Sequence, residues 1–226
     1  MCEWLLQQGA NINSLGEAGN SLLTRSAFDG RLEVCRFVLD NGGALGHKQA
    51  NGENAVLIAT KFDHHKLAAL LLERTKALGD ADNRGIDEPD DCGRTGLMFG
   101  CMMNKMASVK FCVENGTNVD AQDHWGSTPL MFAVRHPKGG LIVDLLLSLA
   151  CEVNLVDKTF RSALHYAMRA GQMATISKLL EAGADPSFLD DDDKTPLELL
   201  LNPAANLTNV QTAITVMSHL VKVLQT

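Results

Sequence analysis

The stretch from Ser162 to Pro186, SALHYAMRAGQMATISKLLEAGADP, decides the fold of this chain. The hydroxyl of Ser162 can cap a short helix, and Gly171 ends that helix. A second helix follows through Leu180 and stops at Gly183, because a residue without a Cβ readily adopts the left-handed conformation that terminates helices. The stretch therefore reads as one complete helix–turn–helix unit.

The same unit recurs along most of the sequence. Successive helix caps are separated by 33, 41, 33, 34 and 33 residues, and an insertion of about eight residues accounts for the long interval. A fixed period of this length is typical of a stacked repeat protein, in which each unit buries its apolar face against its neighbours. The predicted caps are Ser21, Asn54, Thr95, Thr128, Ser162 and Thr195.

The chemistry inside each period also repeats. Proline occupies the first helical position at Pro129 and Pro196, where its missing amide hydrogen costs nothing. The first helix of each unit is rich in small residues, and the second carries bulkier apolar residues at helical spacing, such as Ile176, Leu179 and Leu180. A polar, turn-prone stretch follows each second helix, which predicts an extended finger.

A helix–turn–helix plus finger of about 33 residues resembles the ankyrin repeat. The family motif G-x-T-P-L-H-x-A-A is matched best by GSTPLMFA at 126–133 and next by SALHYA at 162–167. The family element G-A-D-x-N appears as GANIN at 9–13 and as GADPS at 183–187. The resemblance covers nearly the whole chain. It implies an all-α solenoid of about six stacked ankyrin repeats with β-hairpin fingers.

The sequence departs from the family pattern in several places. Only His165 fills the family's histidine position, and the resemblance implies that it hydrogen-bonds within the repeat scaffold. The unit that begins at Asn54 is the most divergent, so its finger is expected to be irregular. Some family members carry hydroxylated finger asparagines, and Asn13, Asn118 and Asn154 are placed at that position here. Asparagine is also common there for turn geometry alone.

The two ends of the chain differ. Residues 1–10 resemble only the close of a second helix, so the chain starts in the middle of a repeat. We expect a fragment of a longer array, with a first repeat reduced to one helix as the alternative. Residues 209–224 form an amphipathic pattern with a polar back, which predicts a capping helix. The expected division of the single domain 1–226 is a partial repeat at 1–18, repeats at 19–51, 52–91 (with an acidic insertion at about 75–91), 92–125, 126–159 and 160–192, and a capping repeat at 193–226.

Composition excludes several classes of function. A net charge of −7 makes sequence-independent binding to nucleic acid or anionic lipid a poor fit. No apolar run approaches the ~18 residues of a membrane span, and the N-terminus lacks the features of a signal peptide. The six cysteines are scattered without a C-x-x-C pair, which favours buried, reduced thiols over a disulfide framework. We therefore expect a cytoplasmic protein without membrane insertion, with a nuclear or organelle-associated cytosolic assembly as the alternative.

A search for catalytic or ligand-binding chemistry yields little. Lys138-Gly139-Gly140 lacks the frame of a phosphate-binding loop, and no G-x-S-x-G motif is present. The adjacent His64 and His65 point to different sides and lack further zinc ligands at suitable spacing. We expect no catalytic residue, metal site or cofactor.

Two acidic segments leave alternatives open. DADNRG at 80–85 resembles the start of a calcium loop, but Arg84 takes a ligand position and Asp91 stands where a bidentate glutamate belongs. A solvated, mobile acidic loop is the favoured interpretation of the insertion, and docking of a basic partner is the alternative. The run from Asp190 to Asp193 is interpreted in the same way.

In a stack of such repeats, the first helices and the fingers form a concave face that binds partners. Aromatic residues, methionine and arginine anchor protein interfaces, and several occupy variable positions on that face. The alternative is that some of them pack against neighbouring fingers. The expected protein-binding residues are Phe62, Arg94, Met102, Met103, His124, Trp125, Arg135, His136, Lys158, Phe160, Arg161 and Arg169.

The favoured function is a non-catalytic adaptor or scaffold that holds one or more partner proteins. We expect it to be monomeric alone or a subunit of a hetero-complex. Two alternatives remain open. In the first, the chain would be a regulatory or substrate-recruiting region of a larger enzyme whose catalytic domain lies outside it. In the second, it would be a fixed structural subunit of a large assembly.

Overall fold

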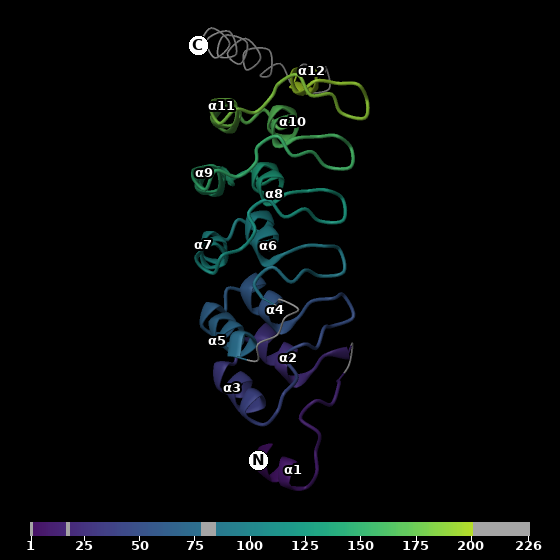
Figure 1. The fold of residues 1–226 in the computed structure, drawn as a ribbon, viewed down its shortest axis with the longest axis vertical. Helices are drawn as coiled ribbons and strands as arrows, with labels where there is room; N and C mark the ends of the chain where they lie inside the picture. Colours follow the sequence, from purple (N-terminus) through teal and green to yellow (C-terminus); the bar gives the residue numbers. More distant parts are fainter. Residues whose placement is uncertain (1, 17–18, 78–84, 201–226) are drawn as a thin grey trace. The chain divides into compact units, whose positions relative to one another are not determined.

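The computed structural model describes residues 2–16, 19–77 and 85–200, which form short helices joined by turns (Figure 1). They fall into two units. Unit 1 comprises residues 1–100 with 107–118, and unit 2 comprises residues 101–106 with the chain from 119 onward. Among the described residues there is no strand, and two isolated β-bridges join Lys48 to Asn54 and Val156 to Ser162. The all-α repeat architecture expected from the sequence is confirmed.

Unit 1 contains two layers of helices. The first helices α2 and α4 contact each other, and each contacts the second helix that follows it in the chain, α3 or α5 (Figure 1). The second helices α3 and α5 also contact each other. The helices that begin in this part of the chain are α1 (Cys2–Gln7), α2 (Leu22–Asp29), α3 (Leu32–Asp40), α4 (Ala55–Lys61), α5 (His65–Ala77) and α6 (Gly96–Met102), and α7 (Met106–Glu114) follows.

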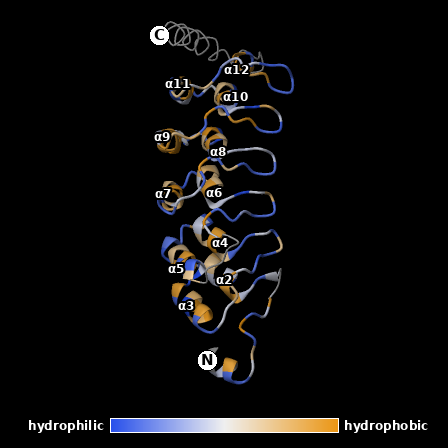
Figure 2. Cartoon of the chain, in the orientation of Figure 1, coloured by the Kyte–Doolittle hydropathy of each residue, from blue (hydrophilic) through white to orange (hydrophobic). Residues whose placement is uncertain are grey.

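Unit 2 repeats the arrangement. The first helices α8, α10 and α12 lie in one layer, and the second helices α9 and α11 lie in the other (Figure 1). Hydrophobic residues concentrate in the helices and hydrophilic ones in the fingers between repeats, as Figure 2 shows. The helices are α8 (Pro129–Arg135), α9 (Gly140–Ser148), α10 (Ala163–Arg169), α11 (Met173–Glu181) and α12 (Pro196–Leu200).

Each first helix from α2 to α12 begins one residue after a predicted cap. The Ser21 hydroxyl accepts a hydrogen bond from the Thr24 amide at 3.2 Å, and the Asn54 side chain accepts one from the Leu57 amide at 2.8 Å. These bonds satisfy amide groups that lack a partner inside the helix. At the cap of α10, the Ser162 amide donates to Nδ1 of His165 at 3.1 Å. The scaffold role implied for His165 is therefore confirmed.

The core is made of small and aliphatic side chains. Ala27, Ala59, Ala133 and Ala167 of the first helices are fully buried, which lets these helices approach their neighbours closely. Among the five cysteines whose side chains the structure describes, no disulfide forms. Four of them are buried, and burial raises the pKa of the Cys112 thiol to about 12. The expectation of reduced structural thiols holds for these residues.

Four of the described fingers are tight turns organised by a buried aspartate. The Asp123 carboxylate accepts hydrogen bonds from the amides of Trp125 at 2.9 Å and Ser127 at 2.8 Å, and the Gly126 amide donates to the Asp123 carbonyl at 2.9 Å. Because the two arms of each finger pair over so few residues, no strand forms among the described residues. The same turn is built on Asp90, Asp157 and Asp190.

This turn corrects the interpretation of the two acidic segments. Asp90 is 4% exposed and Asp190 is 3% exposed, so both are structural residues instead of members of solvated loops. Thr75 to Ala77 complete α5, which places the start of the insertion later than expected. Asp87 accepts hydrogen bonds from the Thr117 hydroxyl and from the Asn118 amide at 2.8 Å. The rest of the calcium-like stretch, at 80–84, lies outside the described residues, as does the predicted capping helix at 209–224.

Amide side chains join successive repeats within each unit. The Asn154 side chain accepts from the Asp185 amide at 2.8 Å and donates to the Gly183 carbonyl at 3.0 Å. Asn13 makes the equivalent pair of bonds in unit 1. In two of the intervening repeats the acceptor is an aspartate: Asp87 binds the Asn118 amide at 2.8 Å, and Asp120 binds the Glu152 amide at 2.9 Å. Asn118 therefore does not occupy the position of Asn13 and Asn154, contrary to the alignment made from the sequence.

Candidate protein-binding surface

Trp125 stands at the tip of the first finger of unit 2. Its side chain is 56% exposed, although its backbone is held firmly. The Trp125 amide donates to the Asp123 carboxylate at 2.9 Å, and the Trp125 carbonyl accepts from the Lys158 amide of the next finger at 2.8 Å. A large aromatic side chain is thus presented to solvent on a rigid support, which suits an interface anchor.

Phe160 stands at the tip of the next finger in an unusual conformation. Its φ is +57°, at the turn position that Gly52, Gly93 and Gly126 occupy in other fingers. A bulky residue in the left-handed region carries a steric cost of roughly 1–2 kcal/mol. Its side chain is 59% exposed, so burial recovers little of that cost. Backbone strain at a residue that packs poorly directs attention to function.

Arg135, at the end of α8, lies above two aromatic rings. Its guanidinium carbon is 5.1 Å from the centroid of Tyr166 and 5.9 Å from that of Phe132. The Tyr166 hydroxyl donates to the Asp157 carboxylate, and burial together with this bond raises the pKa of Tyr166 to about 12. The phenol is therefore neutral at physiological pH. The Arg135 side chain lies over the rings but remains exposed.

The other predicted residues of unit 2 divide by their surroundings. Lys158 and Arg169 are exposed, and His124 is exposed beside Trp125. His136 accepts a hydrogen bond at Nδ1 from the Lys138 amide at 3.1 Å. Arg161 is engaged inside the chain: its Nε lies 3.0 Å from the Asp190 carboxylate, and a terminal nitrogen lies 3.2 Å from that of Asp192.

Among the remaining predicted residues, Phe62 and Arg94 of unit 1 are more enclosed than Trp125, and Met102 and Met103 belong to unit 2. The Phe62 ring packs edge-on against Phe28, with 4.7 Å between centroids. Arg94 lies 2.6 Å from the Asp90 carboxylate and stacks over the Phe99 ring at 4.8 Å. Met102 is half-buried and Met103 is 38% exposed. Local packing, the alternative considered for the sequence, therefore applies to Phe62, Arg94 and Arg161.

Sequence reasoning missed Tyr166 as a member of this surface. It lies four residues after its cap, in register with Phe99 and Phe132, and that aromatic register was a usable signal. We name the following set the tip surface: Trp125, Arg135, Lys158, Phe160, Tyr166 and Arg169. All of these residues belong to unit 2.

The tip surface is positively charged. In the part of the chain that the structure describes, Arg135, Lys158 and Arg169 form no ion pair. The nearby aspartates are committed to finger turns. Burial opposes ionisation of Asp157, but hydrogen bonds from Tyr166, Thr159 and the Arg161 amide hold its pKa below the usual range. Asp157 therefore stays ionised in its turn and does not pair with these cations.

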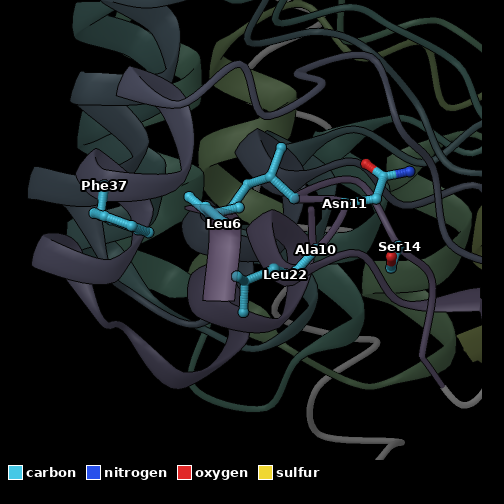
Figure 3. Close-up of a pocket in the computed structure, with 7 residues that line it drawn as sticks. Leu6, Ala10, Asn11, Ser14, Leu22 and Phe37 are labelled. Atoms are coloured by element: carbon cyan, nitrogen blue, oxygen red, sulfur yellow. The ribbon is translucent and has the colours of Figure 1, made fainter. Parts of the chain in front are cut away.

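Two further features lie outside the tip surface: an apolar cavity and a cluster of carboxylates. A cavity of about 230 Å³ in unit 1 is lined mainly by apolar side chains, including Leu6, Leu22 and Phe37 (Figure 3). It lacks the convergent polar groups that orient a ligand. The carboxylates of Asp190, Asp191 and Asp192 lie close together, but Arg161 already contacts all three. Neither feature indicates catalysis.

Comparison with known proteins agrees with this architecture. The family profile "Ankyrin repeats (3 copies)" matches residues 75–157, and "Ankyrin repeat" matches residues 160–191. The crystal structure of the ankyrin repeat domain of Bcl-3, described as a unique member of the IkappaB protein family, superposes with a TM-score of 0.78. It is 22% identical and covers 96% of this chain and 90% of that chain, which supports the fold.

Two relatives are much longer than this chain. Neurogenic locus notch homolog protein 1 of Homo sapiens is 30% identical over 184 residues, which is 81% of this chain and 7% of the relative. Putative palmitoyltransferase ZDHHC13 of Danio rerio is 26% identical over 200 residues, which is 88% of this chain and 30% of the relative.

Within the described residues, no helix is long and apolar enough to cross a membrane. The two family profiles together cover just over half of the chain, in the register of the caps and fingers described above. The chain therefore belongs to the ankyrin repeat family.

Proposed function

We propose that this chain is a non-catalytic adaptor or scaffold module that binds a partner protein through the tip surface of unit 2. The observation that carries the proposal is Phe160, a bulky residue kept at φ +57° with 59% of its side chain exposed. Glycine would remove the strain at this turn position and is found there in three other fingers, while Asp193 holds the equivalent position at φ +54°. A strained, exposed aromatic beside the equally exposed Trp125 is better explained by partner contact than by stability.

Ankyrin repeats act as protein-interaction modules, which supports the proposal. Rigid aromatic side chains lose little conformational entropy on binding, and cations above aromatic rings can pair with carboxylates of a partner. We infer that Trp125 and Phe160 supply apolar contact, and that Arg135, Lys158 and Arg169 supply charge. Met102, Met103, His124 and His136 are proposed as peripheral contacts.

The test is affinity capture from native extract with the full chain and two single variants, Trp125→Ala and Phe160→Gly. Each variant should lose a partner that the unmodified chain retains, by tenfold or more, as expected for interface anchors. Circular dichroism and urea unfolding should show both variants folded.

Leu141→Ser is the matched control. Leu141 is a large apolar residue on α9 that is 73% exposed, so it is even more exposed than Trp125 but lies in the layer of second helices. Capture should survive this change. Loss of the partner with Leu141→Ser, and retention with Trp125→Ala and Phe160→Gly, would move the binding surface to the second helices and overturn the proposal.

A second candidate is a recruiting region of a larger enzyme. The similarity to a putative palmitoyltransferase, of which this chain spans 30%, favours it. In that case the tip surface would hold the substrate or a regulator, and the chemistry would reside in another domain of the same polypeptide. Sequencing of the full-length transcript distinguishes the two candidates, because a catalytic domain in the same reading frame would establish the second.

We also propose that the module acts in the cytoplasm, alone as a monomer or as a subunit of a hetero-complex. Light scattering of the purified chain should return a mass near 24.4 kDa. A mass of twice that value would show that the chain is a dimer and that the monomer prediction is wrong. Fluorescence microscopy of the tagged protein tests the compartment.

A further inference from the structure

In the repeat that contains α4, the residue before the helix cap neutralises a cation on the first helix. In α4, Lys61 lies seven residues after its cap, and its ammonium is 2.5 Å from the carboxylate of Glu53, which precedes the cap Asn54. Both side chains are largely enclosed, with 18% of Lys61 and 5% of Glu53 exposed. The geometry of the repeat thus brings the residue before the cap to the cation eight positions later.

Unit 2 places arginine at the same position of two first helices and no carboxylate opposite it. Arg135 follows the cap Thr128 by seven residues, and the residue before that cap is Ser127. Arg169 follows the cap Ser162 by seven residues, and the residue before that cap is Arg161. The absence of an ion pair at Arg135 and Arg169 in the described structure therefore follows from register.

Each of these cations lies close to an aromatic residue of the tip surface. Lys158 is joined to Trp125 through the hydrogen bond between their backbones, at 2.8 Å. Arg135 covers the Tyr166 ring, and Arg169 lies one helical turn along from Tyr166 on α10. The chain as a whole carries a net charge of −7, so this local positive surface is opposite in sign to the rest of the molecule.

The next finger marks where the positive surface ends. Its Asp191 amide donates to the Thr159 carbonyl at 3.1 Å, which places the two fingers side by side. Asp191, Asp192 and Asp193 are exposed there. A long polyanion such as single-stranded nucleic acid would extend over these carboxylates and be repelled, whereas a short acidic segment would fit the cations alone.

We propose that the occupant of the tip surface is a protein segment rich in aspartate and glutamate that carries at least one large apolar side chain. Its carboxylates pair with Arg135, Lys158 and Arg169, and its apolar side chain packs between Trp125 and Phe160. This inference rests on the proposed function and assigns the chemistry of the partner.

The experiment is selection of a random twelve-residue peptide library on the full chain, followed by affinity measurement of the enriched peptides. The expected peptides are enriched in acidic and in aromatic or aliphatic residues. Their affinity should fall about tenfold or more between roughly 0.05 M and 0.5 M salt, because ion pairs at an exposed surface are screened.

The decisive variant is Ser127→Glu, which supplies Arg135 with the internal partner that Glu53 gives Lys61. Ser127 is 5% exposed and Glu53 is 4% exposed, so the repeat already accommodates glutamate at this buried position. We expect at least fivefold weaker peptide binding, although every residue of the tip surface is retained. Ser127→Gln is the control of matched shape and should bind as the unmodified chain does.

Two further sets of variants keep the test independent of folding at position 127. Arg135→Glu and Arg169→Glu change exposed residues and should each weaken binding about tenfold. Asp191→Asn and Asp193→Asn remove repulsion beside the surface and should strengthen binding two- to threefold, mainly through faster association. Arg36→Glu alters an exposed arginine of α3 in unit 1 and should leave the affinity unchanged.

The outcomes separate this inference from the proposed function. Peptides that are not acidic, yet lose affinity with Trp125→Ala and Phe160→Gly, would overturn the acidic partner and leave the binding surface in place. Peptides insensitive to every tip-surface variant, or no enriched peptide at all, would overturn both. Stronger binding of a labelled oligonucleotide than of acidic peptides, lost in Arg135→Glu, would assign the surface to nucleic acid.

Discussion

The two units use the same repeat but differ in whether the basic residues of their first helices are paired with carboxylates. In the described parts of unit 1, the lysines and arginines of the first helices and fingers each meet a carboxylate. In unit 2, Arg135, Lys158 and Arg169 do not. The unit 1 pairs are Arg25 with Asp29 (3.3 Å), Arg31 with Asp29 (3.5 Å), Lys48 with Glu88 (2.8 Å), Lys61 with Glu53 (2.5 Å) and Arg94 with Asp90 (2.6 Å).

Two pairs of aromatic residues also differ in how they pack. Phe28 and Phe62 of unit 1 pack against each other, and Lys61 lies 4.5 Å from the ring centroid of Phe99. Trp125 and Phe160 of unit 2 project from their fingers. This difference shows that one set of residues in the repeat determines the fold, and another set determines which side chains can contact a partner. The caps and finger aspartates build the fold in both units. The residue before the cap is a glutamate where it neutralises Lys61, and it is Ser127 or Arg161 in the repeats of Arg135 and Arg169.

The largest effect is expected from breaking the internal pair of unit 1. Glu53→Ala should lower the free energy of unfolding by about 2 kcal/mol, because it leaves Lys61 largely enclosed without its carboxylate. Urea unfolding monitored by circular dichroism measures this loss. Glu53→Ala with Lys61→Met should recover part of it. Equal stability of Glu53→Ala and the unmodified chain would show that the pair is not a structural element.

The second largest effect on the free energy of unfolding is expected from loss of the hydrogen bond between Tyr166 and Asp157. Tyr166→Phe removes one donor to a buried carboxylate and should cost about 1.5 kcal/mol near neutral pH. The folded pKa of Asp157 lies below its unfolded value of about 3.9, so its contribution is present above that pH and disappears as pH falls through the folded pKa. The cost of Tyr166→Phe should therefore shrink in acid.

Tyr166 offers an independent check at high pH, because it is the only tyrosine of the chain. Its folded pKa of about 12 exceeds the unfolded value of about 10, so the stability it contributes is present below pH ~10 and is lost as pH rises toward the folded value. Ultraviolet absorbance should show phenolate forming near pH 12 in the folded chain. Titration near pH 10 before any unfolding would contradict the buried hydrogen bond.

A smaller effect with the opposite sign is expected at the finger tip. Phe160→Gly should raise the free energy of unfolding by about 1 kcal/mol, since glycine adopts positive φ without steric cost. Gly126→Ala is the reciprocal change and should destabilise, because an added Cβ would lie 2.9 Å from Cα of Asp157. Thermal unfolding of the two variants should shift in opposite directions. Destabilisation by Phe160→Gly would show that the ring packs in solution.

The smallest effect on folding is expected from the free cations. Arg135→Ala and Arg169→Ala should each change the free energy of unfolding by less than about 0.5 kcal/mol, because exposed residues without an ion pair contribute little. Peptide affinity should nevertheless fall. Urea unfolding of these two variants and of Glu53→Ala then compares two arginines without an ion pair with Lys61, whose charge is neutralised by Glu53. A loss above 1 kcal/mol at Arg135 would place this residue in the core.

Much of this could be predicted from residue types and spacing. The six caps recur at a regular interval because each must satisfy free amides at the start of a helix, and His165 could be assigned to the scaffold from its motif. The buried finger aspartates were also visible as a recurrence at Asp90, Asp123, Asp157 and Asp190. Asp90 and Asp190 were misread because each lies in a run of acidic residues, where composition suggests solvation and conceals the turn.

By itself, the sequence determined the repeat, its register, its layered helices and the candidate set of exposed residues, because periodic hydrophobicity and capping act locally along the chain. Only the tertiary structure decided which of those candidates are available. Arg161 and Arg135 are both arginines at variable positions, yet Arg161 reaches the aspartates of the next finger, and Arg135 finds only aromatic rings. That distinction depends on which side chains adjacent repeats bring within a few ångströms, and on the conformation imposed on Phe160 by a turn closed through Asp157.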